Sequence, residues 1–70
     1  MRVLLTVVVG YINFDKATLH TKTFTEVLTK EGGAITMAKA IAARIEEIRK
    51  SWPSENGGSR SIISVSHPIL

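Results

Sequence analysis

The side chains that could do chemistry in this chain are few and scattered. His20 and His67 are the only two histidines, and no cysteine accompanies them. A metal site built on them would need carboxylates in good geometry as well, so we interpret both as surface or edge residues. Composition leaves a Ser-His-Asp arrangement open, but the chain has no G-x-S-x-G nucleophile motif. We therefore predict no catalytic residue, no metal site and no cofactor, and we expect a protein that is not an enzyme.

Two further pairs of residues could suggest chemistry. Glu46 and Glu47 are adjacent, and because neighbours on a helix diverge by about 100°, they do not form a paired carboxylate site. Gly32 and Gly33 stand before a helix, whose first amides attract anions. The chain has neither a G-x-G-x-x-G nor a Walker pattern. We therefore interpret the two glycines as a break before the helix, with a minimal anion site as the alternative.

The chain is basic, with a net charge of +3 and a pI of about 9.7. The charge is dispersed, and no block of five or six like charges marks a nucleic-acid-binding arm. Phe14 falls in a turn-prone stretch, where it either folds back over the sheet or serves as an exposed anchor for a partner. We predict six residues as candidates for binding a partner or nucleic acid: Lys39, Arg44, Arg49, Lys50, Arg60 and Phe14.

A helix over residues 34–52 is the clearest element of the pattern. Apolar residues at spacings of three and four form one stripe, which contains Ala34, Met37, Ala38, Ile41, Ile45, Ile48 and Trp52. Pro53 cannot continue the helix, and Glu46 and Lys50 stand four apart in the favourable order. The stripe is too short for a confident coiled-coil seam, so we expect the helix to pack on a sheet.

Two strands are predicted before the helix. Residues 2–12 are apolar on both faces, which is typical of a central strand, and Gly10 within it indicates a bulge or a close approach. Residues 18–28 are rich in threonine and more polar, as expected of an edge strand, and Lys22 and Glu26 would discourage pairing with other edges. Residues 13–17 read as the hairpin loop between them.

A third strand is predicted at residues 60–67, after a loop at 53–59. Ile63, Val65 and His67 are expected on one side of this strand, and the tail that follows is Pro68-Ile69-Leu70. The order ββαβ returns the last strand antiparallel to the first. We therefore predict a single α+β domain over residues 1–70, with a three-stranded antiparallel sheet in the order 2-1-3 and one amphipathic helix on one face.

One helix cannot cover both faces of such a sheet, and this is the main clue to function. The sequence leaves open which face the helix covers, but it predicts that an apolar face remains exposed. We expect a second copy of the sheet to cover it, with Leu4, Thr6, Val8 and Ile12 in the interface. The protein is therefore expected to be a homodimer or a higher even oligomer.

The leading hypothesis is a small, cytoplasmic, non-enzymatic interaction protein that acts as a homo-oligomer and modulates a larger macromolecule. Its size, layout and lack of motifs resemble those of small phage or mobile-element accessory proteins, which implies an inhibitor of host defence. The alternatives are a basic nucleic-acid-binding domain, or a small-ligand binder at an oligomer interface. No segment approaches the roughly 18–20 apolar residues of a membrane span, so no membrane partner is expected.

Overall fold

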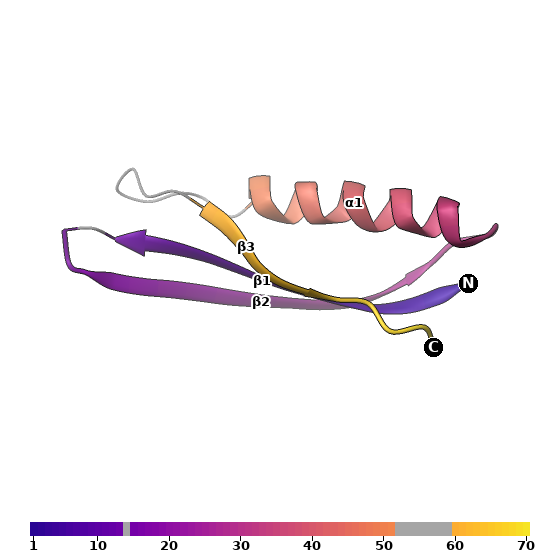
Figure 1. Ribbon diagram of the computed structural model, residues 1–70, viewed down its shortest axis with the longest axis horizontal. Coiled ribbons are helices and arrows are strands. Elements are labelled where there is room, and N and C mark those ends of the chain that lie inside the picture. Colours follow the sequence, from indigo (N-terminus) through magenta and orange to yellow (C-terminus); the bar gives the residue numbers. More distant parts are fainter. Residues whose placement is uncertain (14, 52–59) are drawn as a thin grey trace.

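A computed structural model of the chain describes residues 1–13, 15–51 and 60–70. Its elements follow in the order β1 (Arg2–Asn13), β2 (Thr18–Thr29), α1 (Ala34–Ser51) and β3 (Arg60–Ser66). The three strands form one antiparallel sheet in the order β2-β1-β3, with the single helix packed on it (Figure 1). The predicted α+β class, the ββαβ order and the strand order 2-1-3 are confirmed. Trp52 and the loop at 53–59 lie outside the described residues.

The hairpin of β1 and β2 is long and regular. Its register runs without interruption from Arg2 opposite Thr29 to Asn13 opposite Thr18. The pairing continues to Met1, whose ammonium group donates to the carbonyl of Lys30 at 2.9 Å. β1 lies between the other two strands, as the apolar residues on both of its faces predicted.

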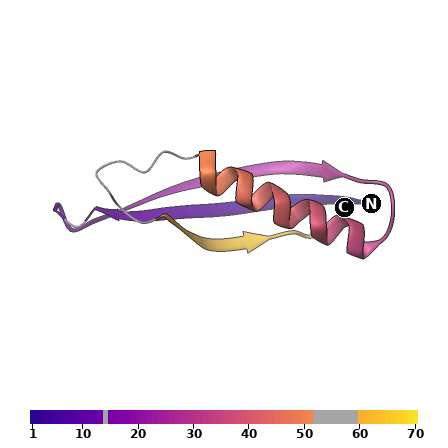
Figure 2. The same ribbon diagram turned by 90° about the horizontal axis from the view of Figure 1, so that it is seen from above.

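The helix covers the odd-numbered face of β1. Four of its side chains there, Val3, Leu5, Val7 and Val9, are almost fully buried. Ile48 of α1 packs into the same core, and Phe24, Leu28, Ile41, Ile45 and Ile62 pack around it. Figure 2 shows that α1 crosses the sheet obliquely and that the hairpin extends beyond the end of the helix. An 18-residue helix is about 27 Å long, whereas a 12-residue strand is about 40 Å, so the helix covers only part of the sheet.

β3 pairs with β1 through a register shift between Val8 and Val9. Because of this bulge, the side chains of β3 do not all lie on the faces of the sheet that were predicted for them. Val65 lies opposite Val7 on the helix side, but Ile63 lies over Gly10 on the other face, where a Cβ at Gly10 would come within 2.2 Å of Ile63 Cδ1. The prediction that Ile63 shares a face with Val65 was therefore wrong, because one extra residue resets the alternation.

The tail continues the line of β3 along β1. Ile69 forms a bridge with Val3, and hydrogen bonds of 2.9 Å run from the Leu4 amide to the Pro68 carbonyl and from the Leu70 amide to the Arg2 carbonyl. Because the tail pairs edge to edge with β1, it does not fold across the second face of the sheet. In the described part of the chain, no helix is both long and apolar enough to cross a membrane.

Candidate functional site

The face of the sheet opposite α1 is the main candidate site, and we call it the open face. Figure 1 shows no described element lying against it. The strand registers place uncharged side chains on it from all three strands, mainly aliphatic residues, threonines and serines. β1 contributes Leu4, Thr6, Val8 and Ile12; β2 contributes Leu19, Thr21, Thr23, Thr25 and Val27; β3 and the tail contribute Ile63 and Leu70. All four residues predicted for an oligomer interface thus lie together on this face.

The open face is uncharged over most of its extent. Among its described residues, Arg2 at one end is the only charged one, since the remaining positions are aliphatic, threonine, serine, glycine or proline. Several of the aliphatic residues are about half exposed or more: Leu19 is 63% exposed, Ile63 51% and Val27 49%. An apolar patch of this kind on a soluble protein is typical of an interaction surface.

Two hydroxyl groups at the centre of the open face pair with each other. The Thr25 hydroxyl donates to the Thr6 hydroxyl across the β1–β2 pair at 3.5 Å, which reduces the cost of removing both groups from water. Gly10 leaves room for Ile63 to lie flat on the sheet, since a Cβ at that position would displace it. The face is therefore suited in shape and polarity to packing against another sheet.

The basic residues of α1 do not form a free cationic patch. Arg44 forms ion pairs with Glu26 of β2 at 2.5 Å and with Glu47 at 3.1 Å. These hydrogen bonds raise the pKa of Arg44 above its ordinary value. Glu46 pairs with Arg49 at 2.5 Å and lies 4.0 Å from Lys50.

Three of the predicted binding residues are thus committed to carboxylates within the protein. Lys39 lies on the exposed side of the helix. Phe14 and the side chain of Arg60 lie outside the described residues. Of the four candidates whose side chains the structure describes, only Lys39 has no ion pair with a carboxylate assigned to it, so these residues do not present a cluster of free cations to a nucleic acid.

The two histidines occupy unrelated places. The His20 ring stacks on Tyr11 across the hairpin with 4.8 Å between ring centroids, and its Nε2 lies 3.1 Å from the Thr18 hydroxyl. His67 lies at the other end of the sheet, near the first half of α1. Within residues 1–13, 15–51 and 60–70, no three histidine, aspartate or glutamate side chains come close enough to hold a metal ion.

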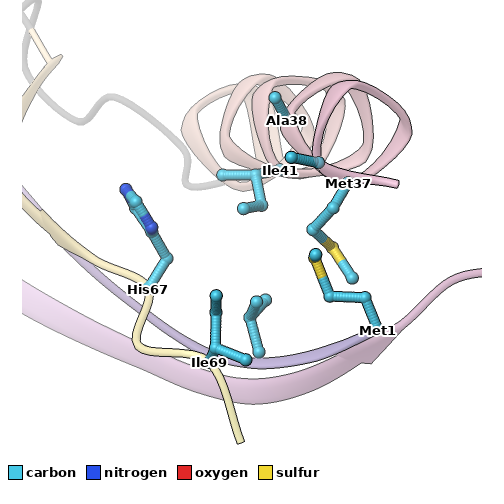
Figure 3. A pocket seen from close by; sticks show the side chains of 8 residues that line it. Met1, Met37, Ala38, Ile41, His67 and Ile69 are labelled. Carbon is cyan, nitrogen blue, oxygen red and sulfur yellow. The ribbon is translucent and has the colours of Figure 1, made fainter. Parts of the chain in front are cut away.

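A cavity of about 210 Å³ lies between the first half of α1 and the end of the sheet (Figure 3). His67 stands on one side of it and Ile69 beneath it, with Met1 and Met37 opposite. Val3, Ala34, Ala38 and Ile41 complete the lining. This cavity was not predicted, although there was a signal: Ala34 and Ala38 place short side chains on the apolar stripe of the helix, where larger ones would fill the space.

No family model matches this chain, and neither the curated proteins nor the solved structures contain a significant match to it.

Proposed function

We propose that this protein is a non-enzymatic interaction protein that works as a homo-oligomer, assembled through the open face. The observation that carries the proposal is the uncovered apolar side of the sheet, on which residues such as Leu19, Val27 and Ile63 stay about half exposed or more. Two copies packed face to face about a two-fold axis supply the missing layer to each other. Such an interface is self-complementary, because the same residues come from both copies.

The energetics favour this arrangement. Fully burying a valine, leucine or isoleucine side chain contributes about 1.5–3 kcal/mol, so covering the exposed half of one contributes about 1 kcal/mol. In a two-fold dimer each such residue counts twice. Because a 70-residue chain buries a small share of its surface, association also adds to the stability of the fold itself.

The role that we propose for the oligomer is to bind and inhibit a larger macromolecule in the cytoplasm, as small accessory proteins of phages and mobile elements do. The projecting hairpin supports this role, since it extends beyond α1 and carries exposed Asp15 and Lys16 at its end. Phe14, which precedes Asp15 in the sequence, lies outside the described residues. A contact made there leaves the open face available for self-association. Capture of a partner by the wild-type chain but not by a Phe14→Ala variant would test this contact.

The experiment for the oligomer compares lysine substitutions on the two sides of the molecule. Val27→Lys and Thr6→Lys each place a charge on the open face, whereas Ala43→Lys places one on an exposed position of α1. We expect the Ala43 variant to keep the wild-type mass in light scattering. Val27→Lys should halve the mass and Thr6→Lys should leave an unstable or aggregating chain. Wild-type mass in the Val27 variant would contradict the proposal.

A further inference from the structure

The two outer edges of the sheet differ in charge. The β2 edge carries Lys22 and Glu26, of the kind that discourage pairing with another strand. On the β3 side, residues 61–70 contain no lysine, arginine, aspartate or glutamate. No described strand pairs with the outer side of β3. β3 begins with Arg60, but the uncharged, partly β-branched stretch that follows it is a site where another strand can add.

Pro68 does not protect this edge, because its nitrogen faces inward. The Leu4 amide donates to the Pro68 carbonyl, and the Leu70 amide donates to the Arg2 carbonyl. Backbone groups of successive residues in a strand point alternately to either side, so those of Ile69 point away from β1. By the same alternation, the amides and carbonyls of Val65 and His67 also point outward. From Val65 to Ile69, beyond the bulge at Ile63, the edge therefore presents outward donors and acceptors at every second residue.

The helix flank above the β3 edge is apolar in the first half of α1, whereas Glu46 and Arg49 form an ion pair farther along it. Ala38 lines the same cavity as His67 and Ile69, which places this flank of α1 on the β3 side. Ile35 and Ala42, three residues before and four after Ala38, share the flank. Ile35 is 76% exposed. On the flank toward β2, Arg44 forms ion pairs with Glu26 of β2 and with Glu47, so that flank is tied to its own sheet.

We propose that the β3 edge pairs antiparallel with the β3 edge of a second copy, giving a continuous six-stranded sheet with both helices on one side. Residues 61–70 of a second copy are themselves an uncharged segment of the kind that can add to this edge. With the two-fold axis at Ser66, Val65 lies opposite His67 of the partner subunit, and both residues have outward backbone groups, as an antiparallel hydrogen-bonded pair requires. Val65, 37% exposed, then lies beside the cavity at His67 of the partner subunit.

This inference rests on the proposed homo-oligomer and adds a second, separate interface to it. The open face lies on one side of the sheet, whereas the β3 edge and the apolar helix flank lie at its margin and on the other side. Used together, the two interfaces close a tetramer of two stacked six-stranded sheets with three mutually perpendicular two-fold axes.

Hydrogen exchange combined with mass measurement tests the edge pairing. In the assembled wild-type protein, the outward amides of Val65 and His67 should exchange more slowly than those of Thr23 and Thr25, by about tenfold or more. The two threonine amides point outward on the β2 edge by the same alternation, since Lys30 pairs inward with Met1. The wild-type mass should be four times that of the chain.

A matched pair of variants gives the control. Ala42→Glu places a charge on the flank above the β3 edge, whereas Ala43→Glu places the same charge one residue away, toward solvent. Ala42→Glu should halve the mass and speed exchange at Val65 and His67, while Ala43→Glu should change neither. A dimer in which these amides exchange rapidly would overturn the edge pairing and leave the open-face dimer intact. A dimer in which they stay protected would support the edge and overturn the open face, and a monomer would overturn both.

Discussion

Gly32 is the residue at which backbone conformation matters most before the helix. Its φ of 107° lies in a region that residues with a Cβ rarely adopt, and a Cβ there would meet the Thr36 hydroxyl oxygen at 3.0 Å. A Cβ on Gly33 would meet nothing within 4 Å. We predict that Gly32→Ala lowers the free energy of unfolding by about 1–2 kcal/mol, and Gly33→Ala by clearly less. Urea denaturation measures both; equal losses would contradict the assigned turn.

Glu46 should make the free energy of unfolding decrease as the pH falls. The hydrogen bond from Arg49 holds the pKa of Glu46 below its ordinary value. A carboxyl group whose pKa is lower in the folded state stabilises the fold above its unfolded pKa, and this contribution is lost as the pH falls through the folded pKa. We predict that the melting temperature falls between about pH 5 and pH 3, and that Glu46→Gln reduces the slope. Arg49→Gln should reduce it equally; an unchanged slope in both variants would refute the pairing.

The face of the sheet on which Ile63 lies could not be predicted from the types of its neighbours. Strict alternation placed Ile63 with Val65, but the bulge opposite Val8 and Val9 turns Ile63 to the open face. Alternation did not reveal this bulge, because residues 63–66 alternate between apolar and polar types as they would in a regular strand. Gly10 was the usable signal, since it was predicted to mark a bulge or a close approach, and Ile63 lies against it.

The helix, as an element, is the part of the fold that the sequence predicted best. Its apolar stripe follows a single helical period. In the sequence, two glycines mark the start of the helix and a proline marks its end. Ile48 is almost fully buried in the core, whereas Lys39 is exposed. We predict that Ile48→Ala costs about 2–5 kcal/mol, close to the whole stability of so small a domain, and that Lys39→Ala costs almost nothing. Thermal melts followed by circular dichroism measure both, and equal melting temperatures would show that the helix faces the sheet differently.

The order of the strands in the sheet could be predicted, but not which face of the sheet the helix covers. β1 is apolar on both sides, so its own sequence cannot say which side the helix covers. Phe24 and Leu28 decide this, because they add large apolar side chains to the odd-numbered face of β1, while Thr21, Thr23 and Thr25 lie on the other. The ion pair between Arg44 and Glu26 was also beyond prediction, because it joins helix and strand across 18 positions of the sequence.

The whole molecule consists of two layers, a three-stranded sheet and a helix that covers one face of it. The helix supplies a core for one face of the sheet, and the open face has no counterpart within the described chain. Apolar surface exposed to water costs roughly 25 cal/mol per Å², so the molecule is more stable when a second copy covers it. This is why we propose self-association through the open face, and we assign the contact with a larger macromolecule to the remaining surface as a separate proposal.

Sedimentation equilibrium of the wild-type chain at micromolar concentrations is the decisive measurement of self-association, because it gives mass independently of shape. We predict a species of at least twice the 7.7 kDa chain mass, which dissociates on dilution with a loss of thermal stability. A monodisperse, stable species of 7.7 kDa at those concentrations would contradict the account.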